Sequence, residues 1–244
     1  MKNILITICA RGGSKGIPGK NIKLINNNPL ITYSLAFAKS LQKKLKANTF
    51  IEISTDNEEI KMVANQYGHV TEYSRPTELA TDFAGKISVL IHLLKYSEQK
   101  YLCEFDYLID LDVTSPLRTL EDVLNAFDKI NSNKDALNIF SVSKSHRNPY
   151  FNMVEENAEG FCHLSKSNKG ILTRQSAPKV YDMNASFYIY RKEFFNQGFE
   201  TAITDKSIIQ LIEHTCFDLD EPVDFLFMEW LFIEKKLDFE LIQP

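Results

Sequence analysis

A glycine-rich loop that carries three cations follows the first predicted strand. The apolar run at residues 3–9 leads into ARGGSKGIPGKN, which contains Arg11, Lys15 and Lys20 among its glycines. Glycines let backbone N–H groups approach an oxyanion closely, and nearby cations neutralise its charge. The spacing fits neither a Walker A motif nor the G-x-G-x-x-G of dinucleotide folds. We interpret the loop as a cradle for a large anion; the alternative is a solvated glycine turn, and Lys15 in particular is expected to be a solvated lysine.

Two pairs of carboxylates lie where predicted strands end. Asp110 and Asp112 are two residues apart in LIDLDVTSPLR, a spacing that sends both side chains to one face of a sheet. Asp218 and Asp220 repeat this spacing in FDLDEPVD, just before the last predicted helix. Mg²⁺ commonly takes one or two carboxylates from protein and its other ligands from phosphate and water. Two alternatives stay open: Asp110 pairs with a nearby cation, and Asp220 caps the last helix.

The composition is that of a globular protein with a buried core and a local cationic site. The chain has 244 residues, of which 44% are hydrophobic and 25% charged, and its net charge is −4. This charge balance provides no basic face for nucleic acid. No apolar stretch approaches the ~20 residues that span a bilayer, and the four cysteines form no C-x-x-C pair. We therefore expect a cytoplasmic protein without a nucleic-acid or membrane partner, in which the five histidines are structural or surface residues.

Strand-like and helix-like segments alternate along most of the chain. This order predicts an α/β fold with a mainly parallel, doubly wound sheet and helices on both faces. Strands are expected at 3–9, 49–55, 105–112, 136–143 and 183–190. Helices are expected from Pro29 with Asn28 as N-cap, after a Thr55–Glu58 capping box, over 85–98, after Thr119 and over 221–236.

Residues 144–182 interrupt this alternation. The segment is rich in Ser, Asn, Lys and aromatic residues and contains no long helical pattern. A long irregular segment in a compact domain is normally functional or used for assembly. We therefore divide the chain into an α/β domain, 1–143 plus 183–244, and an arm, 144–182.

The loop motif ARGGSKGIPGKN resembles the N-terminal motif of the nonulosonate cytidylyltransferases. These enzymes, which include the CMP-sialic acid synthetases, join CMP to an acidic nine-carbon sugar. Five further motifs fall in the family's order and cover nearly the whole chain: STDNEEI (54–60), RPTELATD (75–82), TSPLR (114–118), RQSAPKVYDMNAS (174–186) and FDLDEPVD (217–224). The resemblance implies a Rossmann-like nucleotidyltransferase in which the anomeric hydroxyl of the sugar attacks the α-phosphorus of CTP and expels pyrophosphate.

The resemblance also implies roles for individual residues. Arg11, Lys20 and Asp220 would be catalytic, and Asp218 with Asp220 would hold Mg²⁺ or Mn²⁺. The nucleotide would contact Gly12, Gly13, Ser14, Asn21, Arg75 and Ala80. The sugar would contact Asp112, Ser115, Arg174 and Asn184. Three alternatives stay open at this point: a metal-bound water rather than Asp220 takes the hydroxyl proton, Asn21 is a turn amide, and Arg75 and Arg174 are surface arginines.

The sequence around Asp112 departs from the sialic acid branch, where the motif is Leu-Gln-Pro-Thr-Ser-Pro-Leu-Arg. DLDVTSPLR and YDMNAS are most similar to the branch that activates legionaminic acid, so we expect CTP and legionaminic acid as substrates. Asp112 would then recruit a second metal ion or bind an ammonium or amide group of the sugar. The arm 144–182 resembles the family's dimerisation arm, which implies a homodimer in which each arm completes the sugar site of its partner.

Three other functions remain open. The first is a CMP-N-acetylneuraminate synthetase or a related sugar-activating nucleotidyltransferase. The second is a glycosyltransferase that uses Asp110-Leu111-Asp112 as an Asp-x-Asp motif. The third is a non-catalytic nucleotide-binding protein, which would not need both the cationic loop and the terminal carboxylate pair.

Overall fold

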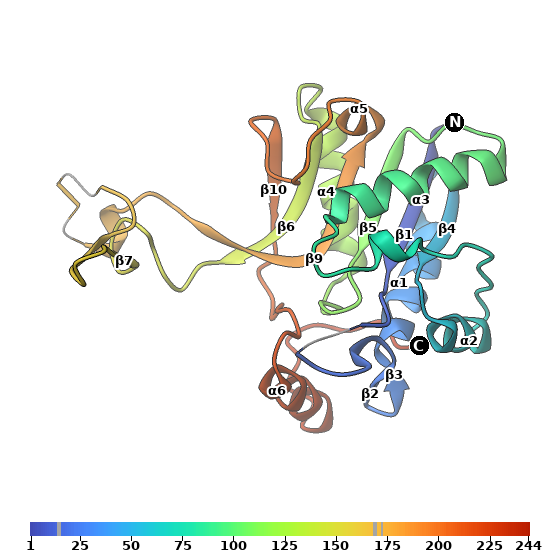
Figure 1. Cartoon of the computed structure of the whole chain (residues 1–244), viewed down its shortest axis with the longest axis horizontal. Coiled ribbons are helices and arrows are strands. Elements are labelled where there is room, and N and C mark those ends of the chain that lie inside the picture. The colour runs from blue at the N-terminus through green and yellow to red at the C-terminus, as the bar shows by residue number, and fades with distance from the viewer. Residues whose placement is uncertain (14–15, 168–169, 172) are drawn as a thin grey trace.

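A six-stranded sheet forms the centre of the computed structural model, which describes residues 1–13, 16–167, 170–171 and 173–244 (Figure 1). The strand order is β10-β6-β9-β5-β1-β4. β9 runs antiparallel to both of its neighbours, and the other pairs are parallel. The strands are β1 (Asn3–Cys9), β4 (Asn48–Ser54), β5 (Tyr107–Leu111), β6 (Asn138–Lys144), β9 (Tyr181–Arg191) and β10 (Ser207–Leu211). The predicted α/β fold with a mainly parallel sheet is therefore confirmed.

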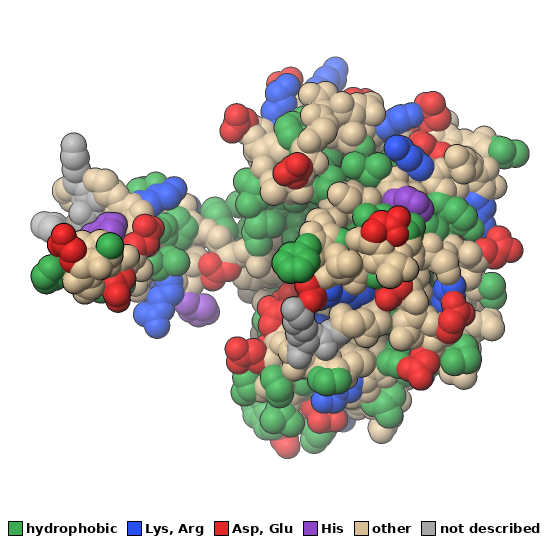
Figure 2. All heavy atoms as spheres, in the orientation of Figure 1, with side chains coloured by type: hydrophobic (Ala, Val, Ile, Leu, Met, Phe, Trp, Pro, Cys, Tyr) green, Lys and Arg blue, Asp and Glu red, His purple; other side chains and the backbone are tan. Residues whose placement is uncertain are grey.

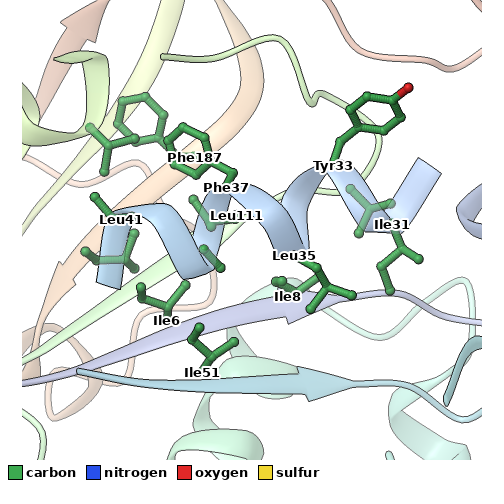
Figure 3. Close-up of a cluster of buried hydrophobic side chains, with 14 of the residues drawn as sticks. Ile6, Ile8, Ile31, Tyr33, Leu35, Phe37, Leu41, Ile51, Leu111 and Phe187 are labelled. Carbon is green, nitrogen blue, oxygen red and sulfur yellow. The ribbon is translucent and has the colours of Figure 1, made fainter. Parts of the chain in front are cut away.

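Helices cover both faces of this sheet. The helices of the described residues are α1 (Leu30–Lys44), α2 (Glu58–Gln66), α3 (Lys86–Tyr101), α4 (Leu120–Ser132), α5 (Lys192–Phe195) and α6 (Pro222–Ile233), of which α6 lies beyond the end of the sheet. Side chains of α1 and α4 pack with Ile4, Ile6 and Ile8 on one face, whereas side chains of α3 and α5 pack with Leu5 on the other. Figure 3 shows Ile6 and Ile8 beneath the side chains of α1. The alternation along β1 follows from the period of two of a strand and fixes which face each helix covers.

Two of the predicted helix starts are wrong, and one is confirmed. Pro29 is the N-cap of α1 rather than its first residue, because Asn28 and Pro29 form β3 and pair with β2 (Leu24–Ile25). The cap of α2 is Asn57, which accepts a hydrogen bond from the backbone N of Ile60, while the Thr55 hydroxyl accepts one from the backbone N of Asn57. Thr119 caps α4 in a capping box, as the sequence predicts.

The arm is an extension of two neighbouring strands. β6 and β9 continue beyond the helices as a ribbon that carries β7 (Val154–Glu156), β8 (Cys162–Leu164) and a short 3₁₀ helix (Arg174–Ser176) away from the sheet (Figure 1). The ladder shifts register between Phe140 and Val142, and Ala185 opposite it has a φ of +57°. This bulge lies where the ribbon leaves the sheet, which is where such irregularities commonly redirect strands.

The end of the chain returns to its beginning. α6 contacts β2, and the segment that precedes α6 lies against the loop that follows β1 (Figure 1). Among the helices of the described residues, none is both long enough and apolar enough to cross a membrane.

Candidate active site

A pocket of about 300 Å³ opens beside the carboxyl ends of β1 and β5. Ligands of open α/β sheets bind at this edge of the strands. Six residues that the sequence analysis places in the site line the pocket: Arg11, Gly13, Lys20, Asn21, Arg75 and Asp112. The fold therefore brings together side chains from the first loop, from the segment after β4 and from the end of β5.

Lys20 joins the cationic loop to the terminal carboxylates. Its Nζ donates a hydrogen bond to the carbonyl oxygen of Leu219 at 2.5 Å and lies 3.7 Å from Oδ1 of Asp220. Gly16 packs against the backbone carbonyl of Asp220 so closely that a side chain at this position would collide with it. The loop and the acidic pair, about 200 residues apart in the chain, thus meet at one point.

Asp218 has an oxygen that lacks a partner. Its carboxyl Oδ1 is buried and has no hydrogen-bond partner in the described part of the chain. Burial raises the pKa of Asp218, the negative charges of Asp112 and Asp220 raise it further, and the Thr114 hydroxyl and Lys20 only partly oppose this rise. Among the residues that the structure describes, no cation forms an ion pair with this carboxylate. The described residues contain no cluster of three or more metal-ligating side chains, so a cation held by Asp218 and Asp220 would need further ligands from a substrate or water.

Asp110 and Asp112 do point to the same side of the sheet, and they share one cation. The Nζ of Lys86 lies 2.9 Å from Oδ2 of Asp110 and 3.3 Å from Oδ2 of Asp112. Asp110 is completely buried, and its Oδ1 accepts a hydrogen bond from the Thr7 hydroxyl at 2.7 Å. Burial opposes the ionised form of Asp112, but Lys86 and two hydrogen bonds from Thr114 lower its pKa below the ordinary value. The alternative in which Asp110 pairs with a nearby cation is therefore confirmed.

Hydrogen bonds hold the first loop in the pocket. The Nδ2 of Asn21 donates to the carbonyl oxygen of Arg11 at 2.9 Å, and the backbone N of Gly12 donates to Asp56 Oδ1 at 2.9 Å. The Arg11 guanidinium forms an ion pair with Asp82 at 2.8 Å. Arg75 is buried and donates from Nε and Nη2 to the hydroxyl and carbonyl oxygens of Ser54. The alternative of a surface arginine at position 75 is therefore wrong.

Comparison with known proteins agrees with this arrangement. A family model described as cytidylyltransferase matches residues 5–236. The chain belongs to the cytidylyltransferase family. It is accordingly a nucleotidyltransferase.

Relatives of this cytidylyltransferase match it over almost its full length. The post-translational flagellin modification protein B of Campylobacter coli is 43% identical, over 97% of this chain and 98% of the relative. A CMP-N,N'-diacetyllegionaminic acid synthase of Campylobacter jejuni is 40% identical, over 97% of this chain and 98% of the relative. A solved structure of CMP:2-keto-3-deoxy-manno-octonic acid synthetase complexed with CTP has a TM-score of 0.66 at 14% identity, over 96% of this chain and 100% of that chain. At 14% identity, this structural similarity shows that the two proteins share a fold.

The structure does not bring all of the predicted site residues of the cytidylyltransferase into the pocket. Ser115 is buried, and its hydroxyl donates to the carbonyl oxygen of Phe217 at 3.2 Å. Asn184 is also buried, in the bulge of β9, where its amide hydrogen bonds with the hydroxyls of Ser141 and Ser143. In this chain, both side chains support the backbone beside the site rather than line it.

Two other predicted residues, Ala80 and Arg174, do not line the pocket either. Ala80 ends a short 3₁₀ helix (Thr77–Leu79), and its neighbours Leu79 and Thr81 line the pocket. Arg174 is exposed at the base of the arm, where its Nη2 donates to the carbonyl oxygen of Ser145 at 3.1 Å. Ser14, predicted to contact the nucleotide, and the neighbouring Lys15 lie outside the described residues.

Sequence reasoning missed two cations of this site. Lys86 begins α3 and lines the pocket; only the fold places it beside β5, so no local motif indicates it. Arg118 is completely buried, and its Nη2 donates to the carbonyl oxygens of Asp112 and Ser115 and to the Ser34 hydroxyl. Burial lowers the pKa of Arg118 to about 10. Arg118 is the arginine of the TSPLR motif, and this motif is the sequence feature that could have indicated it. In the structure, Arg118 holds the turn that carries Asp112 in place.

Proposed function

We propose that the protein joins CMP from CTP to the anomeric hydroxyl of a nonulosonic acid and favours a diacetylated legionaminic acid. The observation that carries the proposal is the contact between the cationic loop and the acidic pair, through Lys20, Leu219 and Asp220. A triphosphate needs cations beside its phosphates. The same cations stabilise the negative charge that develops on the leaving pyrophosphate during the transfer. The motif DLDVTSPLR and the 40% identity to a CMP-N,N'-diacetyllegionaminic acid synthase support the choice of sugar.

In the proposed reaction, the sugar hydroxyl oxygen forms a bond to the α-phosphorus of CTP, and the bond from that phosphorus to the bridging oxygen of the β-phosphate breaks. Lys20 and Arg11 hold the phosphates and offset the charge of the leaving pyrophosphate. Asp220, which is exposed beside Lys20, accepts the hydroxyl proton. Positioning and charge neutralisation supply most of the rate enhancement in such transfers.

A divalent cation, Mg²⁺ or Mn²⁺, fits this site, with Asp218 and Asp220 as its protein ligands. The unpartnered oxygen of Asp218 and the raised pKa of this group support the assignment. When bound, such an ion polarises phosphate oxygens and orients the reactants. Arg11 and Lys86 each already pair with carboxylates, so a triphosphate would need this additional positive charge.

We further propose a homodimer that is formed through the arm. Hydrophobic side chains are exposed on the arm at Phe151, Met153, Val154 and Phe161, and Figure 2 shows the arm standing apart from the body. A groove of about 1310 Å³ between the ribbon and residues 211–217 includes Arg174 in its lining. An arm of a second chain in this groove would bring Arg174 of each chain towards a sugar carboxylate, which an arginine can bind in a bidentate fork.

Pyrophosphate release tests the reaction and the choice of sugar together. The protein is incubated with CTP, Mg²⁺ and, in separate reactions, N,N'-diacetyllegionaminic, pseudaminic or N-acetylneuraminic acid. We expect the highest kcat/KM with the legionaminic acid. Equal values for the legionaminic and neuraminic acids would contradict the sugar assignment, and CTP binding without release in any of the reactions would indicate a non-catalytic protein.

A further inference from the structure

Lys86 lies on the pocket wall between two carboxylates of unequal exposure. Its ammonium is 2.9 Å from the completely buried Asp110 and 3.3 Å from Asp112, whose side chain is 22% exposed. Asp110 is also held by the Thr7 hydroxyl. Asp112 is therefore the partner that is freer to move if the ammonium is removed, since the two carboxylates would then repel each other.

Hydrogen bonds connect Asp112 with the segment that carries the terminal acidic pair, Asp218 and Asp220. The Oδ1 of Asp112 accepts hydrogen bonds from the backbone N and the hydroxyl of Thr114, at 3.0 and 2.9 Å. The carbonyl oxygen of Thr114 accepts a hydrogen bond at 2.9 Å from the backbone N of Leu219, the residue between Asp218 and Asp220. Contacts thus run without interruption from Lys86 through Asp112 and Thr114 to the backbone of Leu219, which lies between the two proposed metal ligands.

We propose that Lys86 is a positioning residue that holds Asp112 in place and, through Thr114 and the backbone of Leu219, positions the segment that carries Asp218 and Asp220. The inference deepens the proposed function, because it concerns the residues that hold the divalent cation. Groups that hydrogen bond to metal ligands fix their orientation, and their loss typically costs 10–100-fold in metal affinity or activity. A purely structural role, in which Lys86 only neutralises the buried Asp110, is the competing explanation.

Two variants separate these explanations. Lys86→Met removes the ammonium and leaves Asp110 buried without its cation. The double variant Lys86→Met/Asp110→Asn removes the buried charge as well, so that the fold no longer needs the ammonium, but Asp112 still lacks its partner. Lys95→Met, which removes an exposed lysine from the same helix, is the matched control.

Binding of Mn²⁺ alone, followed by electron paramagnetic resonance, is the first readout, and kcat for pyrophosphate release is the second. We expect both Lys86 variants to bind Mn²⁺ about tenfold more weakly and to lose about 10–100-fold in kcat, while the Lys95 variant matches the parent protein. Recovery of parental Mn²⁺ affinity and kcat in the double variant would overturn the proposal in favour of the structural role.

The two readouts also keep this inference distinct from the proposed function. If the parent protein binds Mn²⁺ but turns over none of the three sugars, the proposed substrate fails, and the Mn²⁺ affinities of the variants still decide the role of Lys86. If the parent protein binds no Mn²⁺, the metal assignment and the role of Lys86 are both overturned, whichever sugar is turned over.

Discussion

Lys20 is the residue on which the two halves of the active site depend. Its side chain is only 13% exposed, and its ammonium contacts both the Leu219 carbonyl and the Asp220 carboxylate. A cation in this position is fixed before the substrate arrives, so it can stabilise charge as it develops without a reorganisation cost. The resemblance of the loop and of FDLDEPVD to the motifs of the family predicts that these two segments meet in one site.

Lys20→Ala tests this role. We expect kcat to fall by about 10²–10³, the typical cost of removing one preorganised electrostatic donor, while the circular dichroism spectrum is unchanged. Lys23→Ala is the control, because Lys23 is exposed and lies over the ring of Phe225 outside the pocket. A Lys20 variant with parental kcat would remove Lys20 from the catalytic residues.

The limits of residue-level prediction are clear at Asp112. Its spacing from Asp110 predicts that both side chains share a face, and they do. Its partner Lys86 could not be predicted, because Lys86 lies at the end of α3 that is remote from the short loop to β5, and only the packing of the helix on the sheet brings it to Asp112. A charge that is expected to attract a metal or a sugar group is instead already bound to an ammonium of the same chain. For the same reason, an Asp-x-Asp metal site of the glycosyltransferase type is not supported here.

At the scale of elements, a histidine joins β10 to the start of α4. The Nε2 of His214, which lies after β10, is 2.8 Å from Oδ2 of Asp122, and the same oxygen accepts hydrogen bonds from the backbone N and hydroxyl of Thr119 in the capping box. Burial opposes protonation of His214, but the hydrogen bonds to Asp122 and to the Thr215 carbonyl, and the charge of Asp238, raise its pKa above 6.5. Burial likewise opposes ionisation of Asp122, and His214 and Thr119 lower its pKa.

These shifts predict a pH dependence of stability. The contribution of His214 is complete below pH 6.5 and is lost as the pH rises through its raised pKa in the folded protein, whereas that of Asp122 is present above its ordinary pKa of 3.8 and is lost as the pH falls. We expect His214→Gln to lower the free energy of unfolding by about 1 kcal/mol more at pH 5.5 than at pH 8.5, since a charge-assisted hydrogen bond is worth more than a neutral one. Urea unfolding at both pH values measures this difference, and an equal cost at both would contradict it.

The elements themselves were predictable to different degrees. A strand that is covered on both faces, such as β1, has a long continuous run of apolar residues, and this run clearly predicts the strand from the sequence. β10 was missed, because its five residues are each only partly buried at the edge of the sheet. The cap of α1 was misplaced because Asn28 and Pro29 pair with β2. The cap of α2 was misplaced because Thr55 and Asn57 can each accept a backbone hydrogen bond there, and the sequence alone does not decide which of them caps the helix.

At the scale of the whole molecule, groups of exposed hydrophobic side chains lie on the arm and on α6. Besides those of the arm, α6 exposes Val223, Leu226, Phe227, Trp230 and Ile233, and Figure 2 shows hydrophobic side chains gathered over this helix. Exposed apolar patches of this kind commonly mark protein–protein interfaces. A single chain of this sequence therefore leaves surface that a second chain would be expected to cover.

Phe161→Asp tests the proposed dimer. Phe161 lies on the arm and its side chain is 68% exposed, so the variant should fold normally. We expect light scattering with size-exclusion chromatography to shift from the mass of two chains to the mass of one. Leu102→Asp is the control, because Leu102 is 91% exposed at the end of α3 and adopts a left-handed backbone conformation that Asp tolerates. A Phe161 variant that keeps the mass of two chains would rule out this part of the arm as the interface.

The hydrogen bond between Lys20 and the Leu219 carbonyl has a consequence for biosynthesis. The two residues are separated by 199 positions, so a nascent chain on the ribosome can form its first strand and loop long before the groups that complete the pocket have been synthesised. Contacts of such high sequence separation also slow folding. The newly made protein is thus expected to acquire nucleotide affinity only after the segment around Leu219 has been synthesised and has folded against the first loop.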